Sequence, residues 1–290
     1  MVLKFGGELL EDSHGMAALA GTIAAICRAK QPVPLVIVHG GGREIDAALA
    51  KAGIEKRQVD GLRITDHPTL DVVVGVLAGL VNTRFVASLC TAGVRAVGLT
   101  GADAGVALVK KAAPHQSTGG SRVDLGLVGD PIGNDAPMLL LDLCVKGYVP
   151  VVASIGAAQD GSLFNVNADT LASHLAARLN SPRLVVAGAT AGVFDRHGAT
   201  IAHMSFKAID ALIASGDATA GMIAKLTACR AALEGGARDV FIADGRDLPG
   251  LAVLVRHGLK AGAAKNTRIT HKPSRAQSRD ARRQTRRKVS

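Results

Sequence analysis

The sequence predicts a three-layer αβα sandwich, an α/β fold whose central sheet is mostly parallel. Short apolar runs rich in β-branched residues, bounded by Gly or Pro, alternate along the chain with longer Ala-rich segments of helical period. The short runs are apolar throughout, which is typical of strands buried on both faces. Apolar residues make up 48% of the 290, and this is enough for a sizeable core. Strands and helices in alternation therefore indicate a sheet covered by helices on both sides.

The predicted elements follow in order. Strands are expected at 34–40, 95–101, 148–156, 183–189 and 238–245, with a first strand leading into residues 4–7. Helices are expected at 15–30, 43–53, 70–93 and 168–180. Residues 113–131 combine Gly, Pro and Ser with an alternating "VDLGLVG", which suggests a hairpin in a smaller antiparallel patch. Ligands of such sheets bind at the carboxyl ends of the strands, so the loops there are the places to search for a site.

Composition narrows the classes of function. The net charge is +10, but residues 271–290 contain eight Lys or Arg and one Asp, which leaves about +3 for the rest. This basic tail has no hydrophobic period, and we expect it to be disordered and solvated, without a nucleic-acid partner. Aromatic residues are only 2%, so a base-stacking platform is not expected. The longest apolar run, 72–81, is about half of a membrane span, and no leader precedes the first strand.

Four cysteines are scattered without a CxxC motif, and this predicts neither a disulfide framework nor a zinc site. Together with the lack of a leader, the cysteines indicate a cytoplasmic protein with reduced thiols.

The strongest local signal is "VIVHGGGREID" at 36–46. A strand runs into three glycines and then into an amphipathic helix, so backbone N–H groups can approach an anion at a helix N-terminus. We therefore interpret Gly41 and Gly42 as part of an anion cradle; the alternative is a plain tight turn. His39, before the glycines, is expected to be a buried structural residue and not a base.

A second glycine loop follows the first strand. "LKFGG" places Lys4 near the end of a buried strand, ahead of Gly6 and Gly7. A buried ammonium group is costly unless an anion pairs with it. Because the chain contains neither GxxxxGK[ST] nor GxGxxG, a phosphate site would have to be built from these two loops and the lysine.

Two later segments carry polar residues near helix starts. In "FNVNADTLASHLA" (164–176), Asn165, Asn167 and Asp169 alternate with apolar residues, and we expect them to face one way on an extended segment. The alternative for Asp169 is a plain N-cap. In "GDATAGMIAKLTACRAAL" (216–233), Gly221 opens a helix and Lys225 lies one turn further on; a solvated lysine is the alternative.

Taken together, these motifs resemble the amino acid kinase family. They occur in the family's order and at roughly its spacing: "KFGG" (4–7), "VIVHGGG" (36–42), "DGLRITD" (60–66), "NVNAD" (165–169), "LNSPRLVVAGATAGVFD" (179–195) and "GMIAKL" (221–226). The resemblance runs from Val2 to about Ile269. It is greatest to members that phosphorylate N-acetyl-L-glutamate, and it implies the amino acid kinase, or carbamate kinase-like, version of the sandwich.

The resemblance also implies roles for particular residues. Lys4 and Lys225 would flank the transferred phosphoryl group and Asp169 would orient them; Gly41, Gly42, Arg63 and Asn165 would bind the acyl amino acid; Gly6, Gly7 and Gly221 would bind the phosphates. Residues 1–270 would form the kinase domain, with an amino-acid half at about 1–175 and a nucleotide half at about 176–270. The implied reaction uses ATP, with Mg²⁺ held by phosphate oxygens and water and no dedicated protein metal site.

Some expectations depend on where the chain departs from the family. Gly188, Ala189 and Thr190 stand where the family usually has Ser/Thr-Asp-Val, so the nucleotide site lacks a hydroxyl and a carboxylate. Only three residues precede Lys4, and we therefore expect a homodimer, paired through a helix and a sheet face of the substrate half, without inhibition by arginine. The alternatives are a related kinase acting on aminoadipate or on carrier-bound glutamate, and a non-catalytic member that senses a ligand.

Overall fold

A computed structural model describes residues 1–30, 32–117, 119–258 and 266–271. The tail predicted to be disordered lies, apart from His271, outside these residues. The described part contains an eight-stranded sheet with the order β14-β16-β15-β13-β1-β2-β10-β5. Its strands are β1 (Val2–Phe5), β2 (Val36–His39), β5 (Ala96–Thr100), β10 (Val149–Ala153), β13 (Leu184–Gly188), β14 (His203–Ser205), β15 (Val240–Asp244) and β16 (Asn266–Thr270).

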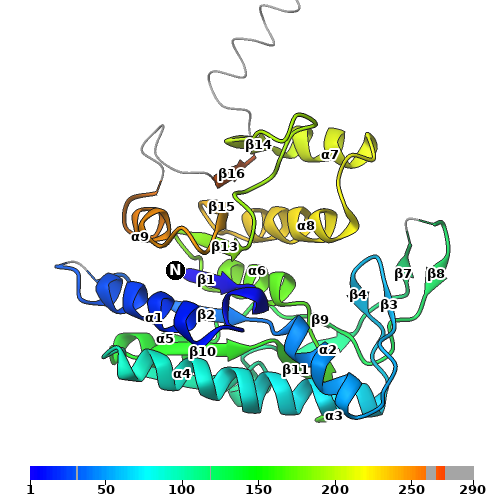
Figure 1. The fold of residues 1–290 in the computed structure, drawn as a ribbon, viewed down its shortest axis with the longest axis horizontal. Coiled ribbons are helices and arrows are strands. Elements are labelled where there is room, and N and C mark those ends of the chain that lie inside the picture. Colours follow the sequence, from blue (N-terminus) through cyan, green and yellow to red (C-terminus); the bar gives the residue numbers. More distant parts are fainter. Residues whose placement is uncertain (31, 118, 259–265, 272–290) are drawn as a thin grey trace, which may run out of the picture.

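Helices cover both faces of this sheet (Figure 1). They are α1 (Ser13–Cys27), α2 (Gly42–Lys51), α3 (His67–Val74), α4 (Asn82–Thr91), α5 (Met138–Val145), α6 (Ala168–Arg178), α7 (Phe206–Ala214), α8 (Ala220–Glu234) and α9 (Leu248–His257). All neighbouring strands pair in parallel except β15 and β16. The predicted three-layer sandwich with a mostly parallel sheet is confirmed.

The core is divided into two clusters by the alternation of side chains along the strands. On β1, Leu3 and Phe5 pack with α1, α4 and α9, whereas Val2 packs on the other face with α5, α6 and α8. Because side chains alternate along a strand, Lys4 faces the same side as Val2. The sequence therefore directs this lysine toward α6 and α8.

The strand order separates the two parts of the chain. Strands β1, β2, β10 and β5 form one end of the sheet, and β13 to β16 form the other. In Figure 1, the blue-to-cyan helices accordingly lie at one end and the yellow-to-orange helices at the other. The carboxyl ends of the central strands β1, β2 and β13 meet at one edge, between these two parts.

Short antiparallel strand pairs complete the structure. They are β3 (Gln58–Val59) with β4 (Leu62–Arg63), β6 (Val109–Lys111) with β9 (Gly129–Pro131), β7 (His115–Gln116) with β8 (Arg122–Val123), and β11 (Ile155–Ala157) with β12 (Leu163–Asn165). The antiparallel patch predicted at 113–131 is confirmed, and the predicted strand 148–156 is divided into β10 and β11. The four cysteines are free thiols.

The apolar run at 72–81 lies within the helix predicted at 70–93, which the structure places at 67–91. Helices α3 and α4 are joined by a π-helical segment, η2 (Gly75–Val81), so His67–Thr91 forms 25 helical residues with a mean hydropathy of 1.8. Among the described residues this helix alone is long and apolar enough to cross a membrane, a test that the core helices of globular proteins also pass. Val73, Leu77 and Phe85 on one of its faces are buried in the core.

Candidate active site

Two glycine loops contact each other at the carboxyl ends of β1 and β2. A Cβ atom added to Gly7 would lie only 2.7 Å from the Cα of Gly41. One added to Gly41 would lie 2.9 Å from a methyl group of Leu77. The loops therefore pack backbone against backbone, and glycine is required because no side chain fits between them. The predicted neighbourhood of Gly6, Gly7, Gly41 and Gly42 is present in the structure.

This contact predicts the effect of Gly7→Ala. The new methyl group would meet backbone atoms and not a flexible side chain, so one loop must move. We expect a loss of about 1–3 kcal/mol in the free energy of unfolding, measured by urea denaturation. Gly42→Ala is the matched control, since nothing lies within 4 Å of its added Cβ. Equal stability of the two variants would contradict the loop contact.

Three charged side chains converge beside these loops. Lys4 Nζ lies 2.8 Å from Asp169 Oδ1, and Lys225 Nζ lies 3.0 Å from Asp169 Oδ2. The three side chains are only 9%, 13% and 17% exposed for Lys4, Asp169 and Lys225, respectively. They come from β1, the first turn of α6 and the second turn of α8. Residues more than 220 positions apart in the sequence thus share one buried carboxylate.

The electrostatics of this triad favour the charged forms of Asp169 and Lys225. Burial alone would raise the pKa of Asp169, but the charges and hydrogen bonds of Lys4 and Lys225 outweigh it and lower that pKa to about 2. Burial likewise opposes the charge of Lys225, while Asp169 overcomes this effect and raises the lysine's pKa. The triad carries a net charge of +1 in a partly enclosed place, which is suited to an anionic ligand.

The segment before α6 differs from the prediction in one respect. Helix α6 begins at Ala168, so Asn165, Asn167 and Asp169 do not lie on one extended segment facing one way. Asn167 is the N-cap, with its Oδ1 accepting from the backbone N–H groups of Asp169 and Thr170 at 2.9 and 3.1 Å. Because Asn167 caps the helix, the carboxylate of Asp169 is available to the two lysines.

Arg63, on β4, lies against the second glycine loop. Its Nη2 donates to Asp46 Oδ1 at 2.6 Å and to the Gly42 carbonyl at 3.3 Å, while its Nη1 is buried without a partner. Asp46 also accepts a hydrogen bond from Lys56 at 2.8 Å. Burial opposes the charge of Asp46, but Lys56 and Arg63 together lower its pKa. The guanidinium group of Arg63 is thereby fixed in place, and its Nη1 is still able to donate hydrogen bonds.

Asp46 was not predicted from the sequence. It lies one helical turn after Gly42 on α2, at the i, i+4 spacing that places its side chain above the glycine loop. The i, i+4 spacing from Gly42 is the sequence pattern from which a role for Asp46 could have been predicted.

The remaining predicted residues lie around the same edge. Asn165 Nδ2 donates to Thr65 Oγ1 at 3.2 Å, and Thr65 follows the β4 strand that carries Arg63. Gly221 is on the first turn of α8, four residues before Lys225, and nothing lies within 4 Å of a Cβ placed on it. The helix is capped by Thr219, whose Oγ1 accepts from Met222 N at 3.3 Å.

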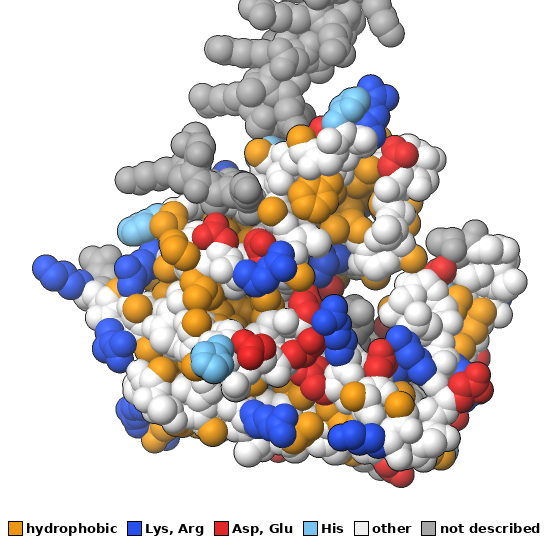
Figure 2. Space-filling view, in the orientation of Figure 1, with side chains coloured by type: hydrophobic (Ala, Val, Ile, Leu, Met, Phe, Trp, Pro, Cys, Tyr) orange, Lys and Arg blue, Asp and Glu red, His pale blue; other side chains and the backbone are white. Residues whose placement is uncertain are grey.

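A cleft of about 490 Å³ opens between Arg63 and Lys225. It is lined by Arg63 and Gly42 from one part of the chain and by Met222 and Lys225 from the other, together with Gly188, Ala189 and Thr190 after β13. On the face shown in Figure 2, acidic and basic side chains gather between the region of α2 and that of α8. The cleft is therefore open to solvent and lined by charge.

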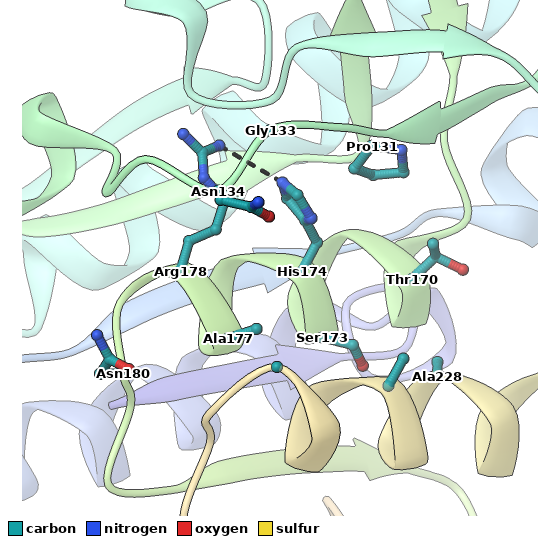
Figure 3. A pocket seen from close by; sticks show the side chains of 12 residues that line it. Pro131, Gly133, Asn134, Thr170, Ser173, His174, Ala177, Arg178, Asn180 and Ala228 are labelled. Atoms are coloured by element: carbon teal, nitrogen blue, oxygen red, sulfur yellow. Dashed lines mark hydrogen bonds between the residues drawn. The ribbon is translucent and has the colours of Figure 1, made fainter.

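Two histidines lie outside the triad, of which His39 is fully buried and His174 is half-buried. His39 Nδ1 is 3.0 Å from the Gly40 carbonyl and its Nε2 is 3.0 Å from Asn82 Nδ2, which fits a neutral ring that donates through Nδ1 and accepts at Nε2. Burial lowers the pKa of His39 to about 4. His174 lines a separate pocket formed by α6, α8 and the segment with Gly133 and Asn134. Its ring points from α6 toward that segment (Figure 3), and its Nε2 is 3.5 Å from Arg178 Nη1. Burial, with the charge of Arg178, lowers its pKa to about 4 as well.

These histidines predict loss of stability in acid. The pKa of His39 is about 4 in the folded protein against 6.5 for an ordinary histidine, so the unfolded chain binds the proton first. The stabilising contribution is complete above pH 6.5 and is lost as the pH falls toward 4, by about 3 kcal/mol for this one ring. Urea denaturation at pH 7.5 and pH 5 measures the loss. His39→Gln should reduce this pH dependence, and an unchanged dependence would contradict the assignment.

The chain is similar in sequence to a known protein family and to several of its members. The sequence profile of the amino acid kinase family matches residues 1–244. Acetylglutamate kinase of Sphingopyxis alaskensis is 40% identical over 249 residues, covering 84% of this chain and 82% of that protein. Acetylglutamate kinase of Methanopyrus kandleri is 39% identical over 246 residues, covering 83% of this chain and 93% of that protein.

Solved structures with the same fold are more distant in sequence. The protein smu.665 of Streptococcus mutans has a TM-score of 0.73 and 24% identity, covering 93% of this chain and 98% of its own. N-acetylglutamate synthase of Neisseria gonorrhoeae, complexed with coenzyme A and N-acetyl-glutamate, has a TM-score of 0.76 and 23% identity, covering 94% of this chain and 59% of its own. These similarities are evidence for the fold alone.

Proposed function

The chain belongs to the amino acid kinase family, and from this membership and the charged cleft we infer that it transfers the γ-phosphate of ATP to the side-chain carboxylate of N-acetyl-L-glutamate. The product is N-acetyl-L-glutamyl 5-phosphate, and this reaction is the second step of arginine biosynthesis. The observation that carries the proposal is the pair of ammonium groups held on one buried carboxylate beside two glycine loops. We expect a cytoplasmic enzyme.

Charge is the central problem of this reaction. The attacking carboxylate and the phosphates are both negative, so the site must reduce their repulsion and hold them in line. Lys4 would serve the acceptor side of the transferred phosphoryl group and Lys225 the leaving side, while Asp169 fixes both lysines. No general base is required, because the attacking carboxylate is already ionised at neutral pH.

The binding roles follow the position of each residue. Gly7 and Gly221 would present backbone N–H groups to the phosphates, and Gly41 and Gly42 would do so for the acyl amino acid. The N–H of Gly6 donates to the Ala187 carbonyl at 3.0 Å, so Gly6 would serve the phosphates only through the space that its missing side chain leaves. The unpartnered Nη1 of Arg63 would bind the α-carboxylate of the acyl amino acid. Asn165, which is bonded to Thr65, would contact the same substrate. Residues 1–175 would form the amino-acid half, and 176–270 the nucleotide half.

Magnesium would enter with the nucleotide. The donors of this cleft are ammonium groups and backbone amides, which suit a polyphosphate whose charge a metal ion has already reduced. Mg²⁺ would then be held by phosphate oxygens and water, and it would neutralise charge that develops on the leaving phosphate.

An ADP-release assay tests the substrate. We expect turnover with N-acetyl-L-glutamate and little or none with glutamate or aminoadipate, because the chain is about 40% identical to acetylglutamate kinases over most of its length. A preference for aminoadipate or for carrier-bound glutamate would identify a sister kinase. No turnover with any substrate, together with a thermal shift on adding acetylglutamate, would identify a ligand sensor instead.

We propose a homodimer paired through the continuous helix η2–α4 and the edge strand β5. β5 ends the sheet, and the long helix next to it leaves Leu80 40% exposed. Light scattering should give twice the mass of the chain, and Leu80→Glu should shift the protein toward the monomer by placing charge in an apolar interface. A wild-type protein that is monomeric at micromolar concentration would contradict this pairing.

A further inference from the structure

Glu8 places a carboxylate inside the proposed phosphate cradle. The residue belongs to a single 3₁₀ turn, Gly7–Leu9, that follows the first glycine loop. Its side chain folds back over Gly6, and a Cβ atom added to Gly6 would lie only 2.3 Å from both carboxylate oxygens. The absence of a side chain at Gly6 thus provides the space that the carboxylate occupies.

The same carboxylate is bound to the neighbouring strand. Glu8 Oε1 accepts a hydrogen bond from the backbone N–H of Ala189 at 3.1 Å. It also lies 3.2 Å from the position that a Cβ of Gly188 would take. Glu8 therefore connects the loop after β1 to the loop after β13, and uses a backbone donor that faces the cleft.

The charge of Glu8 acts on the groups around it. Burial and Asp169 are the larger influences on the pKa of Lys225, and Glu8 adds a smaller raising effect. Burial raises the pKa of Glu44 on α2, and the charges of Glu11 and Glu8 raise it further. The carboxylate is thus close enough to interact with the lysine proposed to contact the leaving phosphate.

We propose that Glu8 is an internal competitor of the nucleotide: its carboxylate occupies the phosphate site beside Gly6 and must withdraw from Ala189 when a nucleoside polyphosphate binds. The Glu8 carboxylate takes the space and the backbone donor that a phosphate group would need, and two negative charges at this distance repel each other. Withdrawal would free the Ala189 N–H for the nucleotide, at a position where the chain has no side-chain hydroxyl or carboxylate. This inference rests on the proposed use of ATP.

Nucleotide binding by charge-neutral variants tests the proposal. Isothermal titration calorimetry with ADP and excess Mg²⁺ should give a Kd about five- to tenfold lower for Glu8→Gln than for the wild type at 50 mM salt, with a smaller difference at 500 mM salt because ions screen an exposed charge. Glu8→Ala should bind at least as tightly as the wild type. Glu11→Gln is the matched control: it removes a carboxylate three residues away that pairs with Arg43, and its Kd should stay within about twofold.

Three outcomes would overturn the proposal. One is an unchanged Kd in Glu8→Gln with unchanged thermal unfolding. Another is a raised Kd with a greater need for Mg²⁺, which would make Glu8 a metal ligand. The third is that neither the wild type nor the variant binds nucleotide. Because binding is measured without turnover, a protein that binds ADP as expected but does not phosphorylate acetylglutamate would contradict only the proposed function.

Discussion

Lys225→Met is expected to lower kcat by about 10²- to 10³-fold, with only a small change in either KM. The reason is that a charged donor aimed at the transferred phosphoryl group is more strongly bound in the transition state than in the ground state. Removal of one such donor from an enclosed site typically costs this much. Lys225 is held 3.0 Å from Asp169 and is only 17% exposed, so no water can fully replace its ammonium group. Steady-state kinetics with varied ATP and acetylglutamate measures the effect.

A surface lysine provides the control for this variant. Lys207 on α7 is exposed, and Lys207→Met should leave kcat within about twofold. Circular dichroism should show that Lys225→Met is folded, since Asp169 keeps Lys4 as its partner. If Lys225→Met turned over at a rate near that of the wild type, its assignment to the phosphoryl group would be wrong.

The second large effect is expected at Arg63, and it changes the KM for N-acetyl-L-glutamate more than kcat. Arg63→Ala should raise the KM for N-acetyl-L-glutamate by about 30- to 100-fold and lower kcat far less, because this guanidinium would bind a part of the substrate that does not react. Loss of a charge-assisted hydrogen bond to a carboxylate typically costs about 2–3 kcal/mol. Arg63→Lys should restore little, since an ammonium group cannot reproduce the planar fork.

Arg63 could also act indirectly, through Asp46. Lys56→Ala separates the two explanations, because Lys56 is the other partner of Asp46 at 2.8 Å and is 42% exposed. If Arg63 binds substrate, Lys56→Ala should change the KM by less than about threefold. A KM raised equally in both variants would mean that Arg63 only positions Asp46 and the loop beside it.

Much of the fold could be predicted from the sequence because the central strands are apolar runs and the helices have a clear period. β10 and β13 are buried along their whole length. Strands buried on both faces are continuous apolar runs, which are easily recognised in a sequence. The hairpins β3–β4 and β11–β12 were not predicted, because strands of two or three residues are too short to show a period. β14 and β16 were missed for the same kind of reason: β14 has three residues, and β16 mixes polar and apolar side chains.

The candidate site divides in the same way. Lys4 could be singled out because a charge within an apolar strand requires a partner, and the structure pairs it with Asp169. The roles of Asp46 and Glu8 could not be predicted from the sequence, because an acidic residue on an amphipathic helix or in a turn looks the same as one that is merely solvated. Only the packing of distant strands gives these two residues a role. The start of α6 was ambiguous in the sequence, because Asn167 and Asp169 are both suitable N-cap residues. In the structure Asn167 is the N-cap.

The most direct test of the account traps the acyl phosphate itself. Wild-type protein incubated with ATP, Mg²⁺, N-acetyl-L-glutamate and hydroxylamine should form the γ-hydroxamate of acetylglutamate in step with ADP, and Lys225→Met should form it at a rate at least 100-fold lower. ADP release without hydroxamate, or hydroxamate formed equally by both proteins, would contradict transfer of a phosphoryl group to a carboxylate between the two lysines.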